Sequence, residues 1–111
     1  MDHKNFKIRK ENIKTLVENL GACMATEKIT VDGELIGYMY REQPDLEVDN
    51  GWRFLSGTET QEYADDSIHW AFYDSNTIAN YDPAIIPYLS LPMGTELERV
   101  KGTEEFRIIC D

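Results

Sequence analysis

The apolar positions near the start of the chain repeat with the period of a helix. Four of them recur at three- and four-residue intervals: Ile13, Leu16, Val17 and Leu20. This spacing gathers apolar side chains on one helical face, and the glycine that follows is a common residue just past a helix end. The pattern therefore predicts one amphipathic N-terminal helix over about residues 10–20.

Beyond this helix, short apolar runs alternate with turn residues, which is the pattern of β-strands. About six strands are predicted, over the runs ACMATEKITV, LIGYMYRE, WRFLS, WAFYD, TELERV and EEFRIIC. The Asp32-Gly33 pair is typical of a tight turn and predicts that the first two strands form a hairpin. The Lys101-Gly102 pair predicts a second hairpin between the last two strands.

Short helices are predicted between the strands. Thr58, with Gln61 three positions later, has the form of a capping box, which predicts a helix over residues 60–65. Asp82 followed by Pro83 has the form of an N-cap with proline at the first helical position. A second short helix is therefore expected to begin there.

No pair of predicted strands is joined by the long crossover helix that usually connects parallel strands. We therefore expect an α+β fold with a mainly antiparallel sheet of about six strands, the N-terminal helix and short connecting helices. The length of 111 residues fits a single domain over residues 1–111. Apolar residues make up 41% of the chain and charged residues 29%, which is the composition of an ordinary folded protein.

The chain carries 21 acids against 11 bases, and its formal net charge is −10. This excess argues against nucleic acid as a partner, because such binding depends on basic contacts to phosphate. It suits a basic protein partner, or it serves solubility alone. No apolar run approaches the roughly 20 residues that span a membrane, and the N-terminus lacks the apolar core of a secretion signal. We therefore expect a cytoplasmic protein with no membrane partner.

The charge is unevenly distributed along the chain. Five bases fall in the first 14 residues, whereas twelve acids and one base, Arg53, lie between Glu42 and Glu98. That second stretch must present negative charge at the surface. Acids on its predicted loops are expected to be exposed and to face a basic partner. These candidate partner-binding residues are Asp45, Glu47, Asp49, Glu62, Asp65 and Asp66.

The run PDLEVDN, which contains three of these acids, resembles the start of a calcium loop. An EF-hand needs glycine at its sixth position and glutamate at its twelfth, but counting from Asp45 gives Asn50 and Ser56. Zinc sites need Cys and His ligands in close pairs, and the cysteines and histidines of this chain stand singly. No metal and no cofactor is therefore predicted.

The sequence contains no catalytic signature, because it lacks a nucleophile elbow, a phosphate loop and a dinucleotide fingerprint. Cys23 and His69 form a catalytic pair only if the fold brings them together, and an inert buried thiol is the commoner state of a cysteine in a strand. Cys23 and Cys110 are the two cysteines, and both are expected to be free thiols in a reducing compartment. We therefore expect a protein that is not an enzyme.

Three stretches carry a resemblance to a known family: ITVDGELIGYMYREQPD, DNGWRFLSGTETQEYADD and YDSNTIANYDPAIIPYL. Over about residues 22–110 the chain resembles a bacterial domain family of unknown function that is grouped with the immunity proteins of polymorphic toxin systems, the immunity protein 33-like family. The resemblance implies a cytoplasmic, non-enzymatic protein that neutralises a toxin domain by binding it. It brings no established catalytic residues to this chain.

Three functions from different classes stay open at this point, the last of which is a stand-alone regulatory or structural domain. The first is the immunity-type binding protein, whose acidic surface meets a basic toxin. The second is a small-ligand-binding or enzymatic domain with a pocket near the Asn76–Tyr88 segment. Its lining would be Trp52, Tyr73, Asn76, Asn80 and Asp82. The polar members of that set can instead satisfy backbone donors at helix starts, and the sequence leaves the oligomeric state undetermined.

Overall fold

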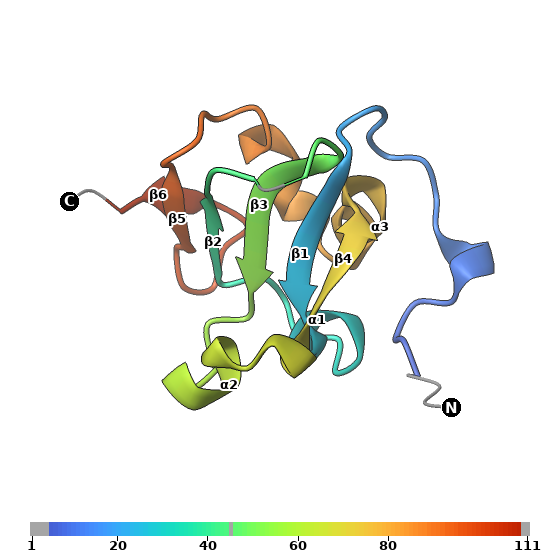
Figure 1. Ribbon diagram of the computed structural model, residues 1–111, viewed down its shortest axis with the longest axis horizontal. Helices are drawn as coiled ribbons and strands as arrows, with labels where there is room; N and C mark the ends of the chain where they lie inside the picture. The colour runs from blue at the N-terminus through green and yellow to red at the C-terminus, as the bar shows by residue number, and fades with distance from the viewer. Residues whose placement is uncertain (1–4, 45, 110–111) are drawn as a thin grey trace.

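One six-stranded sheet forms the protein, with helices behind it and at its lower end in the view of Figure 1. The computed structural model describes residues 5–44 and 46–109. The strands are β1 (Ala22–Thr26), β2 (Tyr38–Arg41), β3 (Asp49–Leu55), β4 (Trp70–Asp74), β5 (Glu96–Arg99) and β6 (Phe106–Ile108). The α-helices are α1 (Glu27–Thr30), α2 (Gln61–Asp65) and α3 (Ser75–Tyr81), and the 3₁₀ helices are η1 (Lys10–Asn12), η2 (Ser67–His69) and η3 (Pro83–Tyr88). The predicted α+β class and the six strands are confirmed.

The sheet is mixed, so the expectation of a mainly antiparallel sheet is wrong. The strand order is β4-β1-β3-β2-β5-β6, and β1 and β3 pair in parallel at its centre. The predicted hairpin between the first two strands does not form, because the chain leaves β1 directly into α1. β2 and β3 form the hairpin instead, and this hairpin places β3 between β1 and β2. The predicted hairpin of β5 and β6 is confirmed.

The N-terminal segment does not form the predicted amphipathic helix. Only the single turn η1 is helical there, and residues 13–21 follow an irregular path along α3. The backbone N–H groups of Lys14, Leu16 and Val17 donate to side-chain amides of α3 rather than to their own helix. Partners distant in sequence therefore replace the internal hydrogen bonds that the helical spacing favoured.

The hydrophobic core lies on one side of the sheet. Alternate residues of β3, Trp52 and Phe54, are fully buried there, and their rings stack at 6.1 Å. The indole Nε1 of Trp52 donates to the carbonyl oxygen of Leu89 at 3.0 Å. Figure 1 shows α3 and the following orange segment, which includes η3, on this side, behind the sheet. Ile78 of α3 and Ile85 of η3 complete the apolar contact with no exposure.

Two helix starts were predicted from capping residues, and one of the two predicted caps is correct. Asp82 caps η3 by accepting from the N–H of Ala84 at 3.2 Å, and Pro83 begins that helix as expected. Helix α2 begins at the expected place, but Thr60 caps it in place of Thr58 by accepting from the N–H of Tyr63. Across the described ranges, none of the helices has the length and apolar character that crossing a membrane requires.

Gly51 is held in a conformation that a larger residue cannot adopt without strain. Its φ is +91°, and a Cβ built on it would collide with the carbonyl oxygen of Glu42, which belongs to the chain just after β2. The N–H of Glu42 donates to the carbonyl of Gly51 at 2.9 Å. Both the left-handed φ of residue 51 and the close approach of the two backbones therefore require glycine at this position.

We expect Gly51→Ala to destabilise the protein through this collision. Gly94 is the matched control, because it has nearly the same φ, +92°, and nothing within 4 Å of a built Cβ. The left-handed conformation alone costs about 1–2 kcal/mol, and forcing atoms into a packed contact adds about 1–3 kcal/mol. Urea unfolding should therefore show a larger loss of unfolding free energy for Gly51→Ala than for Gly94→Ala. Equal losses in the two variants would contradict the proposed collision with the Glu42 carbonyl.

Candidate functional site

One row of side chains crosses the face of the sheet opposite the core. The strand register pairs Phe72 with Met24, Met24 with Arg53, Arg53 with Tyr40, and Tyr40 with Glu96. Paired residues on adjacent strands project to the same face. We call this the open face, because α3 and η3 lie behind the sheet on the other side (Figure 1). Among the described helices, the α2–η2 segment borders one end of the open face, where its residues line a cavity together with Met24 and Arg53.

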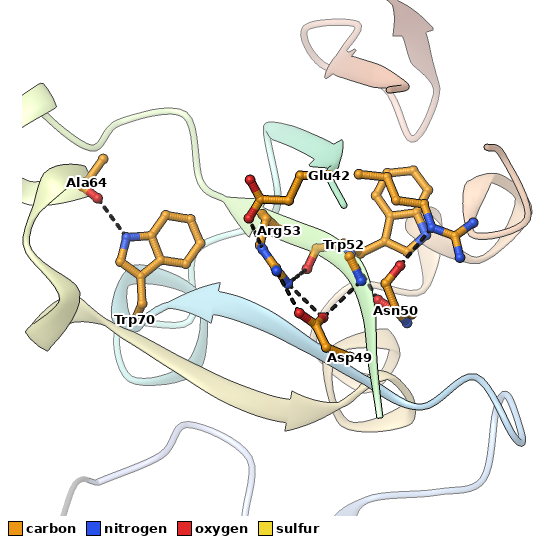
Figure 2. Close-up of polar contacts among 9 residues, drawn as sticks. Glu42, Asp49, Asn50, Trp52, Arg53, Ala64 and Trp70 are labelled. Carbon is orange, nitrogen blue, oxygen red and sulfur yellow. Dashed lines mark hydrogen bonds and ion pairs between the residues drawn. The ribbon is translucent and has the colours of Figure 1, made fainter. Parts of the chain in front are cut away.

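Arg53 lies at the centre of the open face and is held by two carboxylates (Figure 2). Its Nη1 and Nη2 donate to the two oxygens of Asp49 at 2.9 and 2.7 Å, and its Nε donates to Glu42 Oε2 at 2.6 Å. A further bond joins Nη1 to the carbonyl of Trp52 at 3.1 Å. Arg53 is 5% exposed and Asp49 4%. Such burial is tolerated only when the charges are paired and hydrogen-bonded.

A bulge in β3 brings Asp49 within reach of Arg53. Two residues four apart in a regular strand lie about 13 Å apart. Here the register to β1 slips, so that Ala22 faces Asp49 and Met24 faces Arg53. Gly51, with its left-handed φ, lies inside that slip, as glycine often does at a bulge. The N–H of Gly51 also donates to Asp49 Oδ1 at 2.9 Å.

The expectation that Asp49 is an exposed loop acid is wrong. The strand begins at Asp49 itself, and its side chain turns inward to Arg53. The hydrogen bonds from Arg53 hold the pKa of the Asp49 carboxyl below its usual value, although burial acts in the opposite direction. The same hydrogen bonds raise the pKa of Arg53. Asp49 is therefore a structural charge that a binding partner does not reach.

A cavity of about 240 Å³ adjoins this network on the open face. Its lining includes Met24, Tyr40, Glu42, Arg53, Asp65 and Trp70. The indole Nε1 of Trp70 donates to the carbonyl of Ala64 at 2.8 Å, which fixes the ring against the end of α2 (Figure 2). Burial, and then the charge of Glu42, raise the pKa of Tyr40, so its phenol is neutral at physiological pH.

Glu59 positions α2 over the end of the sheet. Its Oε2 accepts from the hydroxyl of Thr26 at 2.6 Å and from the N–H of Ser56 at 2.8 Å, and its Oε1 accepts from the N–H of Gly57 at 2.9 Å. Burial alone would raise the pKa of Glu59, but these hydrogen bonds together hold it below its usual value. A charged carboxylate therefore joins the ends of β1 and β3 just before α2 begins.

The structure divides the other predicted acids between two ends of β3. Glu62, Asp65 and Asp66 lie exposed on α2 and just after it, whereas Glu47 is exposed in the turn before β3. Figure 1 shows α2 below the sheet and the turn before β3 above it. Among the candidate acids that the structure describes, Asp65 alone lines the cavity. Asp45 lies outside the described residues.

The residues proposed for the alternative pocket are engaged elsewhere. Asn76 accepts from the N–H groups of Leu16 and Val17 at 2.7 and 3.1 Å and donates to the carbonyl of Lys14 at 2.8 Å. Asn80 accepts from the N–H of Lys14 at 2.9 Å and donates to the same carbonyl at 2.7 Å. The two amides therefore hold the N-terminal segment against α3 by its backbone.

The remaining three members of that set lie in the packed interior or at its edge. Trp52 is fully buried, and Tyr73 contacts the hydroxyl of Thr30 at 3.0 Å. Asp82 is buried, pairs with Arg99 and accepts from a backbone N–H. None of the five residues lines the cavity on the open face.

Cys23 and His69 have separate surroundings. Cys23 is a free, fully buried thiol, and burial raises its pKa to about 12, so it is protonated at neutral pH. His69 stacks on the ring of Tyr63 at 3.9 Å, and its Nδ1 lies 3.6 Å from a carboxylate oxygen of Glu27. Cys110 lies outside the described residues. Within residues 5–44 and 46–109, no group of three or more His, Cys, Asp and Glu could hold a metal ion.

Sequence reasoning did not identify Glu42, Arg53, Tyr40 or Met24 as part of a site. One signal could have found the network: Arg53 is the one base between Glu42 and Glu98, and it stands within the apolar run WRFLS. A base in a strand with buried neighbours needs an acidic partner. Which acid supplies it depends on the bulge, and the sequence pattern does not reveal the bulge.

Comparison with known proteins identifies one family. The family model described as "Immunity protein Imm33 domain" matches residues 23–109. The match begins at the second residue of β1, covers the other five strands and α1 to α3, and leaves out the N-terminal segment. Neither the curated proteins nor the solved structures contained a match.

The buried pair should make stability depend on acid pH. Because the folded-state pKa of Asp49 is lowered, its contribution is present above the unfolded pKa of about 4 and is lost as pH falls through the folded value. We expect Asp49→Asn to lower the free energy of unfolding by about 3–5 kcal/mol at pH 7 and to show a flatter dependence of stability on pH below about pH 4. Urea melts across that range measure this, and a curve parallel to that of the wild type would contradict it.

The side-chain amides of α3 should protect specific backbone groups of the N-terminal segment. We expect Asn76→Ala to speed hydrogen exchange at Leu16 and Val17, which donate to Asn76. Asn80→Ala should speed exchange at Lys14, which donates to Asn80. The two variants are controls for each other, and residue-resolved amide exchange is the measurement. Uniform acceleration along residues 14–17 in both variants would show that the segment opens as one unit.

Proposed function

The chain belongs to the Imm33 family of immunity proteins, and we propose that it neutralises a toxin by binding it, without catalysis, through the open face. The observation that carries this proposal is a sheet face that bears exposed apolar groups beside acids. Phe72 is 48% exposed on this face, and Ile68 is 68% exposed just before β4. Aromatic and apolar groups surrounded by polar ones are the usual anatomy of a protein interface.

The charge of the protein supports a basic partner. The net charge is −10, and the acids Glu62, Asp65 and Asp66 lie exposed at the α2 end of the open face. Charges of this kind speed the encounter with a partner of opposite sign. Their effect weakens with salt, because the Debye length is about 8 Å at physiological ionic strength. Binding in the cytoplasm, where a toxin would meet its own producer, fits this proposal.

A non-enzymatic mechanism is supported by how the reactive groups are used. The thiol of Cys23 is buried and protonated, and the imidazole of His69 is stacked on Tyr63. The amides of Asn76 and Asn80 hold the N-terminal segment, and Asp82 pairs with Arg99. Each of these side chains therefore stabilises the fold through the contacts named above.

The proposal is tested with a toxin domain identified as the partner by pull-down from the native host. We expect the purified protein to form a stable complex with that toxin and to abolish its activity at equimolar amounts. The association rate should fall as ionic strength rises. If the toxin stays fully active in an excess of the folded protein and no complex forms, the proposal is wrong.

Two charge reversals locate the surface that meets the toxin. Glu62→Lys changes an exposed acid on α2, and Glu47→Lys changes an exposed acid at the opposite end of β3. We expect Glu62→Lys to slow association several-fold at low salt and Glu47→Lys to have little effect, since steering charges act mostly near the contact surface. Stopped-flow rates at several salt concentrations measure this. The reverse order would place the interface at the other end.

A further inference from the structure

We propose that the cavity beside Arg53 receives one basic side chain, arginine or lysine, from the partner protein. The proposal rests on the proposed function, because it names what the toxin presents to the open face. It commits to a side chain rather than to a small molecule, since the cavity of about 240 Å³ is smaller than the roughly 300–1,000 Å³ of usual small-ligand pockets.

The hydrogen bonds around the cavity leave carboxylate oxygens free to accept further bonds, whereas few N–H donors stay free. Arg53 directs its guanidinium to both oxygens of Asp49, to Glu42 Oε2 and to the carbonyl of Trp52. This set leaves Arg53 little capacity to bind an anion. In contrast, Glu42 Oε1 and Asp65 Oδ2 accept no hydrogen bond from any described residue. A ligand that donates hydrogen bonds would therefore complete the site.

The charge around the cavity also favours a cation. Arg53 contributes one positive charge, and Asp49, Glu42 and Asp65 contribute three negative charges, which leaves a net charge of −2. The carboxylate of Glu42 is half exposed, with 50% of its side-chain surface accessible, and Asp65, which is exposed, lines the same cavity. A cationic group in the cavity would meet these carboxylates, as an arginine fork meets a carboxylate.

Aromatic walls suit the stem and the planar head of such a side chain. Trp70 and Tyr40 both line the cavity, together with the thioether of Met24. Cations are attracted to the faces of Trp and Tyr rings, and long basic side chains bury their methylene stems along apolar surface. The ring of Trp70 is already fixed by its bond to Ala64, so binding would cost little ordering of that wall.

Exposed apolar groups lie on the open face next to residues that line the cavity, where a partner would cover them. Phe72 shares the open face with Met24, and Ile68 follows Ser67, which also lines the cavity. A partner that covers these groups would exclude water from the cavity, and energetically important contacts are typically surrounded in this way. Arginine fits best, because its planar guanidinium can both stack on Trp70 and bridge two carboxylates.

The first test compares two single-atom changes at exposed acids. Asp65→Asn removes the charge at the cavity and can keep the bond to Gln61, whereas Glu47→Gln removes an exposed charge outside it. We expect Asp65→Asn to weaken toxin binding about 30-fold or more, mainly through faster dissociation, and Glu47→Gln to weaken it less than about 3-fold. Calorimetry with the toxin domain identified by pull-down measures both affinities. Equal, small effects would overturn the cation site while leaving the proposed function intact.

The second test needs no toxin. Arginine amide at millimolar concentration should shift the indole N–H signal of Trp70 in a saturable way, whereas the signal of Trp52, buried in the core, should not move. Norvaline amide, which lacks the guanidinium, is the control ligand, and Asp65→Asn should abolish the shift. A Trp70 shift without toxin neutralisation would support the site and contradict the proposed function. Neutralisation with neither the shift nor the Asp65→Asn effect would overturn the site alone.

Discussion

The buried ion pair between Arg53 and Asp49 is the contact on which the arrangement of the sheet depends. It forms only because β3 bulges at Gly51 and shortens the distance between residues that a regular strand would hold apart. The same glycine allows the close approach of β3 to Glu42, whose carboxylate completes the coordination of Arg53. One local conformation therefore fixes the β2–β3 hairpin and the parallel β1–β3 register together.

This pair also explains why one face of the sheet stays open. Trp52 and Phe54 project to the core and are fully buried beneath α3 and η3. Arg53, between them in sequence, projects to the opposite face and brings two carboxylates with it. An apolar helix could not cover Glu42 and Asp65 without leaving their charges unpaired, which is costly. These carboxylates therefore disfavour a covering helix on this face, and the proposed basic partner would meet them there.

The sequence predicted the elements whose signals are local and missed those set by distant partners. The strands WRFLS and WAFYD, the last hairpin and the Asp82-Pro83 helix start follow from alternation and capping chemistry, and the structure has all of them. The N-terminal helix failed because Asn76 and Asn80, more than 50 residues away, bind the backbone of that segment. The apolar spacing from Ile13 to Leu20 carried no information about those amides. The prediction that Asp49 is exposed was wrong for a similar reason, because its pairing with Arg53 depends on a bulge in β3.

The acid excess separates into charges that hold the fold and charges that face solvent. Asp49, Asp82 and Glu98 pair with Arg53, Arg99 and Arg107. By contrast, no described cation lies within ion-pair distance of Glu62, Asp65 or Asp66 at the α2 end. Unpaired acids gathered at one end of a protein produce an electric field that points in one direction, whereas the charges of ion pairs largely cancel. The exposed acids of α2 therefore contribute negative potential beside the cavity, where the proposed basic side chain would be both steered and bound.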